Sequence, residues 1–128
     1  MSDQQLTITP KLLQRLSSLK SQLTFGPTAD EMYTGVHDLG SRAVCDSTFA
    51  RLIDDLVAGL PTRATKKFVL GKFRSSWKSL PICDTEDRER AVAHYELIMD
   101  ALGIESSDGL LARLLYGPIL GWLLRPKR

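Results

Sequence analysis

The sequence predicts an all-α fold, a compact bundle of five to six helices around one core. Three observations support this prediction: apolar residues recur at helical spacing in several segments, helix-capping residues precede these segments, and strand patterns are scarce. The chain has 128 residues, of which 43% are hydrophobic and 25% are charged, as in an ordinary globular protein. We therefore expect residues 1–128 to form a single helical domain.

The first helix is expected to begin at a Thr-Pro pair at 9–10, where Thr caps the helix and Pro occupies its first turn. Leucines then follow at helical spacing until a Gly-Pro pair at 26–27 ends the pattern. Thr28 and Glu31 match a capping box, which predicts a short helix over 29–39.

Two longer helices are expected in the middle of the chain. Asp46 or Ser47 is expected to cap the first, and a Gly-Leu-Pro run at 59–61 ends it. The second is predicted over 63–79, before Pro81. The residues expected to be buried in these two helices are Phe49, Leu52, Ile53, Leu56, Val57, Leu60, Val69, Phe73, Trp77 and Leu80.

The stretch DTEDRER at 84–90 is typical of a helix start. A cap at Asp84 or Thr85 places carboxylates near the first turn, where they stabilise the positive end of the helix dipole. This helix is expected to bury Ala91, Tyr95, Ile98, Met99 and Leu102 and to end at Gly103.

A last helix is predicted from Ser106 or Ser107, and a Gly-Pro pair at 117–118 breaks it. Residues 109–128, here called the apolar C-terminal segment, are the most apolar part of the chain. Three alternatives remain open for it: a closing core helix, an exposed patch that binds a partner or a second copy of the chain, or an anchor at a membrane surface.

Four acidic residues form the first candidate site, a surface for binding a partner protein. They are Glu86, Asp87, Glu89 and Glu96. Glu89 and Glu96 lie opposite the apolar face of their helix, so we expect them in water. Because a catalytic carboxylate needs burial or a like-charged neighbour to shift its pKa, the pattern favours a helix start with a solvated face over a catalytic acid pair.

Four basic residues form the alternative site. Arg63, Lys67, Arg74 and Lys78 fall within about 60° of one another on the helix expected at 63–79. Such a stripe suits phosphates or an acidic protein surface, although any amphipathic helix needs a polar outer face. The aromatic residues of this helix are expected on its core side, which argues against stacking on the bases of single-stranded nucleic acid.

Sequence motifs for catalysis, cofactors or metals are absent. His37 and His94 have no partners at metal-ligand spacing, and His94 is expected at the edge of an apolar helix face. No GxSxG elbow, phosphate loop or local cysteine signature occurs. We therefore expect no catalytic residue, no cofactor and no metal.

A cytoplasmic location is expected. Cys45 and Cys83 lie far apart, which does not indicate a disulfide framework. The first ten residues lack a signal segment, and no apolar run reaches the length of about 18 residues that an ordinary membrane span needs.

Residues 84–117, DTEDRERAVAHYELIMDALGIESSDGLLARLLYG, resemble the C-terminal signature of a small family of uncharacterised bacterial all-helical proteins. The resemblance implies a lone single domain, and some proteins of this kind sit beside toxin genes as candidate immunity proteins. It provides no catalytic residue to carry over. Residues 118–128 lie outside the signature, so the resemblance assigns them no role.

The first functional hypothesis is an immunity protein, not an enzyme, that neutralises a cognate toxin by binding it. The net charge of +2 counts against simple charge complementarity with a basic toxin cleft, although local acidic patches remain available. The alternative is a helical nucleic-acid or phosphate-binding module that uses the basic stripe, and a small helical enzyme is a third possibility. Self-association through the apolar C-terminal segment is compatible with each of them.

Overall fold

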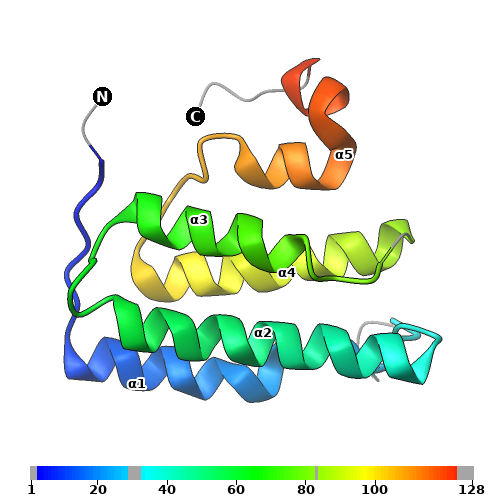
Figure 1. The fold of residues 1–128 in the computed structure, drawn as a ribbon, viewed down its shortest axis with the longest axis horizontal. Coiled ribbons are helices and arrows are strands. Elements are labelled where there is room, and N and C mark those ends of the chain that lie inside the picture. The colour runs from blue at the N-terminus through cyan, green and yellow to red at the C-terminus, as the bar shows by residue number, and fades with distance from the viewer. Residues whose placement is uncertain (1–2, 29–32, 83, 124–128) are drawn as a thin grey trace.

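The computed structural model describes residues 3–28, 33–82 and 84–123, with side chains up to residue 117. This part of the chain contains five α-helices and one 3-10 helix, η1, which confirms the all-α prediction (Figure 1). The helices in chain order are α1 (Pro10–Ser18), η1 (Leu19–Gln22), α2 (Leu39–Gly59), α3 (Lys66–Trp77), α4 (Thr85–Leu102) and α5 (Leu110–Leu123).

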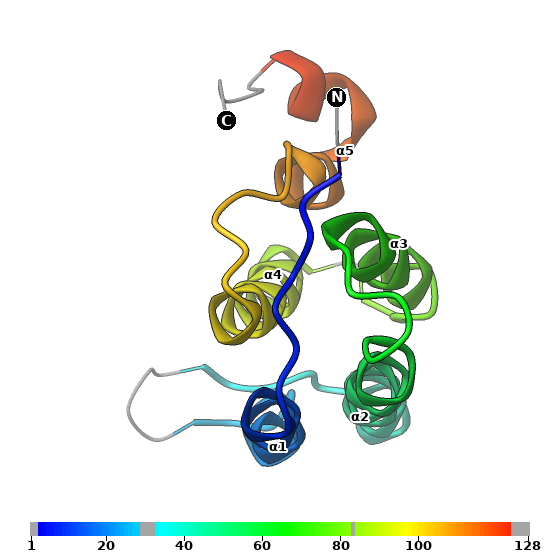
Figure 2. The same ribbon diagram turned by 90° about the vertical axis from the view of Figure 1, so that its left-hand side faces the viewer.

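The first four α-helices form a bundle of two layers. α1 and α2 lie side by side in one layer, α3 and α4 lie in the other, and α5 lies beyond them (Figures 1 and 2). Contacts join α1 to both α2 and α4, α2 to α3, and α4 to α5. Tyr95 of α4 completes the ring of contacts, because its side chain packs against Phe73 of α3 with ring centroids 4.6 Å apart.

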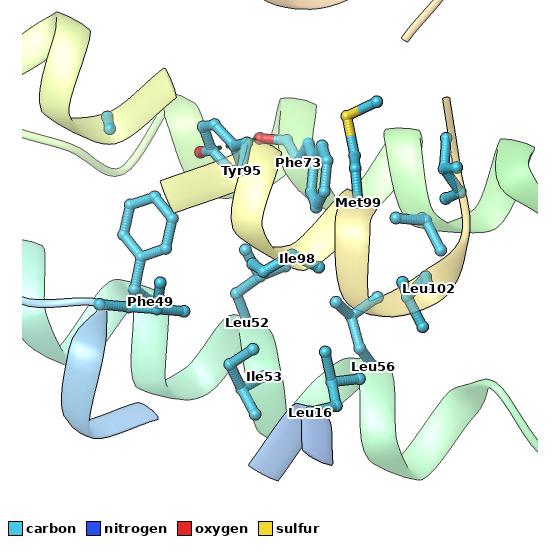
Figure 3. Close-up of a cluster of buried hydrophobic side chains, with 14 of the residues drawn as sticks. Leu16, Phe49, Leu52, Ile53, Leu56, Phe73, Tyr95, Ile98, Met99 and Leu102 are labelled. Carbon is cyan, nitrogen blue, oxygen red and sulfur yellow. Dashed lines mark hydrogen bonds between the residues drawn. The ribbon is translucent and has the colours of Figure 1, made fainter. Parts of the chain in front are cut away.

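The core lies between the two layers, and Tyr95 is its largest fully buried side chain (Figure 3). The Tyr95 ring lies 4.9 Å from that of Phe49 and 6.4 Å from that of Trp77. Its hydroxyl lies 2.7 Å from Ser76 Oγ, so the buried polar atom has a partner. The predicted core is largely confirmed, with Trp77 and Val57 only partly buried and with these residues buried: Phe49, Leu52, Ile53, Leu56, Leu60, Val69, Phe73, Leu80, Ala91, Ile98, Met99 and Leu102.

Helix ends confirm three of the predicted boundaries. Thr9 Oγ1 accepts a hydrogen bond from the Leu12 amide at 3.1 Å, and Asp84 Oδ1 accepts one from the Glu86 amide at 2.8 Å. Both caps satisfy amide groups that have no partner within their helix. Gly103 follows α4 with φ of 74°, a left-handed conformation that glycine adopts without steric cost.

The short helix predicted over 29–39 is wrong where it can be checked. Residues 33–38 are not helical, and residues 29–32, which include Glu31 of the predicted capping box, lie outside the described residues. The chain here turns back on itself instead, because the Val36 amide donates to the Phe25 carbonyl at 2.9 Å. These backbone groups are therefore satisfied without a helix.

The predicted start of α2 at Asp46 or Ser47 is also wrong. α2 begins about two turns earlier, with Asp38 as its cap, since Asp38 Oδ2 accepts a hydrogen bond from the Ser41 amide at 2.8 Å. Leu39 and Val44 are exposed in these first turns, so the amphipathic pattern that identifies a helix is missing there.

α1, α3 and α5 differ from the predictions mainly in length. α1 ends at Ser18 and continues as η1, and α3 is shorter than the predicted range 63–79. In α5, Gly117 is non-helical (φ 85°, ψ 169°), which confirms the predicted break. Leu110 is buried, and Leu111 and Leu114 pack against the core, so the first part of α5 is a closing core helix.

For the rest of the apolar C-terminal segment, the partner-binding and membrane-anchor alternatives remain predictions. Nothing is described of the side chains of 118–123, and residues 124–128 lie outside the described residues. Among the helices that are described, none combines the length and the apolar character that crossing a membrane requires.

The segment before α1 lies along the start of α3 (Figure 2). The Leu6 amide donates to the Ala64 carbonyl at 2.8 Å, and the Lys66 amide donates to the Gln4 carbonyl at 2.9 Å. The Lys67 amide donates to a carboxylate oxygen of Asp3 at 3.0 Å. Residues 3–6 therefore provide partners for the first amide groups of α3.

Candidate functional site

The outer face of α4 carries three of the four predicted acidic site residues. Glu86, Glu89 and Glu96 are exposed, as predicted, and no ion pair joins them to another residue in the described ranges. Other exposed residues of α4 fall within the same arc of about 100° and are Ala93, Leu97 and Asp100. This set of six residues, here called the α4 face, is an acidic surface that also includes Ala93 and the apolar side chain of Leu97.

Asp87 does not belong to the α4 face, and the prediction that places it there is wrong. Its side chain is only 8% exposed, and its carboxylate accepts a hydrogen bond of 2.6 Å from the Tyr33 hydroxyl. The Arg90 guanidinium lies 4.4 Å from the centroid of the Tyr33 ring. Burial, together with the hydrogen bond to Asp87, raises the pKa of Tyr33 well above its ordinary value. Asp87 therefore anchors Tyr33 to α4 rather than meeting a partner.

Further polar contacts hold the segment between η1 and α2 at the same end of the bundle. Asp46 Oδ1, from within α2, accepts a hydrogen bond from the Phe25 amide at 2.7 Å. His94 Nε2 lies 2.8 Å from the Thr24 carbonyl and therefore donates to it. His94 is buried and lies at the edge of the buried arc of α4, as predicted.

The thiol of Cys45 lies in this region as well. It is buried and forms no disulfide. Burial raises the pKa of Cys45 to about 11, and the nearby carboxylates of Asp46 and Asp87 act in the same direction. The thiolate is the nucleophilic form of cysteine. Because the Cys45 thiol is held protonated, it acts as a buried packing group rather than as a nucleophile.

The four basic site residues predicted from the sequence are all exposed. Lys67 and Arg74 lie on α3, whereas Arg63 precedes the helix and Lys78 directly follows it. Their neighbours on α3 are partly neutralised. Lys66 Nζ lies 2.9 Å from a carboxylate oxygen of Asp108, and Lys72 Nζ lies 4.0 Å from one of Asp55.

Part of this basic stripe lines a hollow of about 400 Å³ beside α3, here called the α3 hollow. Its lining comprises three cationic side chains, two hydroxyl side chains, one aromatic ring and one glycine, namely Arg63, Lys67, Lys72, Thr65, Ser75, Phe68 and Gly71. Arg74 and Lys78 are not part of it. The structure thus divides the predicted stripe and adds Lys72 to the part that surrounds a cavity.

Phe68 is the aromatic member of the α3 hollow, and the sequence analysis did not predict it there. It packs partly against the core but also lies among the basic residues, so the expectation that the aromatic residues of this helix lie only on its core side is wrong. The Arg63 guanidinium lies 4.9 Å from the centroid of its ring, and Lys72 Nζ lies 5.8 Å from it. Both distances are within the range of cation–π interactions.

Two smaller hollows adjoin the α3 hollow. One, of about 140 Å³ between α2 and α3, shares Lys72 and Ser75 with it and is also lined by Thr48, Arg51 and Ser79. The other, of about 280 Å³ between α3 and α5, shares Lys67 and Gly71 but contains the carboxylates of Asp3 and Asp108. Polar hollows therefore follow much of the outer side of α3.

A metal site has no support among the described residues, because no three or more His, Cys, Asp or Glu side chains come together there in a way that holds an ion.

Residues 7–118 match the model of a protein family described as a domain of unknown function, DUF4844. The chain belongs to the DUF4844 family. The structure of this DUF4844 chain is similar to the crystal structure of a DUF3571 family protein from Acinetobacter baumannii, with a TM-score of 0.73 and 28% sequence identity. The similarity covers 90% of this chain and 96% of that one. Comparison of the DUF4844 chain with curated proteins gives no match.

These findings confirm the coarser part of the expected resemblance, a bacterial family whose function is not assigned. They assign no site residue and no activity to the DUF4844 chain, so its function has to be argued from its surfaces.

Proposed function

We propose that this chain is a protein-binding inhibitor, an immunity protein that acts in the cytoplasm and neutralises a cognate toxin by covering its working surface. The observation that carries the proposal is the α4 face, which presents Glu86, Glu89, Glu96 and Asp100 without neutralising partners among the described residues. A basic surface on the toxin, such as the cleft of a nuclease, is the complementary partner.

The apolar residues of the α4 face support protein binding rather than binding of a small cation. Leu97 is 39% exposed and lies at one edge of the arc, and the small side chain of Ala93 lies near its middle. Protein interfaces commonly combine apolar side chains, which carry much of the affinity, with charged ones. The charged side chains increase the association rate and select the partner.

A hollow at the end of the α4 face extends the same surface. It has a volume of about 170 Å³ and is lined by Glu96 and Glu105, with the hydroxyl residues Ser106 and Ser107 beside them. A Lys or Arg side chain of the toxin would find both charge and hydrogen-bond acceptors there.

The test measures binding to the protein encoded by the neighbouring gene. Replacing Glu89 and Glu96 together with Gln should weaken binding by about 2 kcal/mol or more, because charges at a tight interface are lost. Stability should change by less than about 0.5 kcal/mol, since both side chains face water. Calorimetric titration and thermal melting measure the two quantities.

The matched control replaces Gln14 and Gln22, which are exposed on α1 and η1, with Lys. It changes the net charge by the same amount but leaves the α4 face intact, so binding should weaken far less. Equal affinity losses in the two double variants would mean that only net charge matters and would contradict a role for the α4 face.

The alternative, a nucleic-acid-binding module that uses Arg63, Lys67, Arg74 and Lys78, is supported by the exposure of all four side chains. Binding to a labelled duplex at two salt concentrations tests it. Because counterion release favours binding at low salt, a lack of binding at about 50 mM salt would exclude this alternative.

A further inference from the structure

The α3 hollow gathers positive charge that the described chain does not neutralise. Arg63, Lys67 and Lys72 line it, and no carboxylate does so among the described residues. Of these three, Lys72 alone has an acidic partner within the described ranges, Asp55, and their charged atoms are 4.0 Å apart. Like charges held around one cavity repel each other, and a bound anion removes that repulsion.

The neighbouring hollow between α3 and α5 differs because its lining includes carboxylates. There the Asp3 carboxylate accepts a hydrogen bond from the Lys67 backbone amide, and Asp108 forms a 2.9 Å ion pair with Lys66. The α3 hollow has no carboxylate in its described lining, and its one ion pair is the 4.0 Å contact of Lys72 with Asp55.

Two of the three cations of the α3 hollow, Arg63 and Lys72, are held in place by Phe68. Its ring packs against α2 so closely that a Cβ on Gly59 would lie 2.4 Å from it, so only glycine permits this position. Arg63 and Lys72 contact the ring through cation–π interactions. These two flexible side chains are therefore partly ordered before a ligand binds, which lowers the conformational entropy lost on binding.

Gly71 is a second sign that the hollow is used. It lies in the middle of α3, where glycine destabilises a helix relative to alanine. Packing does not require glycine at this position, because a Cβ added there would have no atom within 4 Å. The absence of a side chain instead keeps the α3 hollow open.

We propose that the α3 hollow binds the phosphate group of a small phosphorylated metabolite that also carries hydroxyl groups. Arg63 is suited to bidentate hydrogen bonds with phosphate oxygens, and Lys67 and Lys72 add charge. The hydroxyl-bearing part of the ligand lies along Ser75 and reaches the hollow between α2 and α3. There Thr48, Arg51, Ser79 and the carboxylate of Asp55 offer polar contacts to hydroxyl groups. This inference does not depend on the α4 face.

The limited extent of the α3 hollow favours a small molecule over a nucleic acid. The hollow is open to solvent and has a volume of about 400 Å³, enough for a small molecule to lie against its wall. The basic residues Arg74 and Lys78, which would extend a backbone-binding surface, lie outside the hollow. The Phe68 ring already has two cations over it, so it does not offer a free face for stacking on bases.

The experiment titrates the whole chain with glucose 6-phosphate, and separately with inorganic pyrophosphate and glucose, while amide NMR signals are recorded. We expect saturable binding of glucose 6-phosphate, weaker binding of pyrophosphate and none of glucose, with signal changes concentrated at residues 63–75. Replacing Lys67 with Ala or Gly71 with Leu should weaken binding about tenfold or more, while each variant keeps its melting temperature. Gly71→Ala should weaken binding less and melt no earlier than the wild type.

The control is Lys78→Ala, which removes the same charge just after α3 but outside the hollow. It should change the affinity less than about twofold. An equal loss in Lys78→Ala and Lys67→Ala would overturn the proposal, because it would reveal a diffuse basic surface. Lack of saturation at about 10 mM glucose 6-phosphate would also overturn it, as would binding of a labelled single-stranded oligonucleotide without binding of the sugar phosphate.

Discussion

α3 and α4 are neighbouring helices with opposite outer surfaces. Tyr95 of α4 joins the two helices, because its ring packs against Phe73 and Trp77 of α3. The outer side of α3 is nevertheless basic and hollowed, whereas that of α4 is acidic. The cations of α3 are arranged by residues of other elements, such as Gly59 of α2 and Asp108 before α5. The glutamates of the α4 face have no such described neighbours.

The charge of a helix surface therefore follows from the sequence of that helix, whereas the shape of the surface depends on the elements packed against it. The sequence of α4 is sufficient to place Glu89 and Glu96 in water. The sequence of α3 indicates a basic stripe, but the cavity within it depends on how α2 meets Phe68. A predicted charged stripe therefore names candidate residues without saying which of them share a site.

Removing the contact between the two helices should have the largest effect. Tyr95→Ala deletes a fully buried ring that touches Phe49, Phe73 and Trp77, so the free energy of unfolding should fall by about 3–5 kcal/mol. Denaturant unfolding measures it. Tyr95→Phe is the control, since it removes only the hydroxyl near Ser76 and should cost about 1 kcal/mol. A loss below about 1 kcal/mol in Tyr95→Ala would mean that this ring is not buried in the core.

Local signals were sufficient for most of the bundle but not for the start of α2. Thr9, Asp84 and Gly103 act at helix ends through their own backbone neighbours, so their roles can be predicted from the sequence. Asp46 resembles a cap in the sequence, but its carboxylate accepts a hydrogen bond from Phe25, 21 residues away. Only the folded chain brings those two groups together.

Two acids of α4 sharpen the contrast between buried and exposed carboxylates. Asp87→Ala should lower the free energy of unfolding by about 1–3 kcal/mol, because the buried Tyr33 hydroxyl loses its acceptor. Glu89→Ala, on the exposed side of the same helix, should change it by less than about 0.5 kcal/mol. Thermal melting of the two variants side by side checks the difference, and equal losses would place both carboxylates in the same environment.

Asp87 shows why the candidate acidic site was only partly predictable. Helical spacing places it on the buried face, four residues before Ala91 and eight before Tyr95, whereas Glu86 and Glu89 lie outside that face. Its partner, Tyr33, lies 54 residues earlier, and no spacing rule connects the two positions. The burial of Asp87 is therefore predictable from the sequence, whereas the tertiary contact that satisfies its carboxylate is not.

Effects of opposite sign are expected at two glycines, Gly71, which lines the α3 hollow, and Gly59, which packs against the Phe68 ring. Gly59→Ala should destabilise the fold by about 1–2 kcal/mol, because the new methyl group meets the Phe68 ring. Gly71→Ala should stabilise it by about 0.5–1 kcal/mol, since the methyl group enters open space in a helix. Denaturant midpoints that shift in the same direction for both variants would contradict the described geometry of the hollow.

The docking of residues 3–6 onto the start of α3 has a consequence for hydrogen exchange. First-turn amides of a helix normally exchange rapidly with solvent, because no carbonyl of the same helix reaches them. Here the Lys66 and Lys67 amides donate to Gln4 and Asp3. Their exchange rates therefore measure how often the N-terminal segment detaches, independently of the stability of α3. These two amides are a built-in probe of an opening that leaves the helical bundle folded.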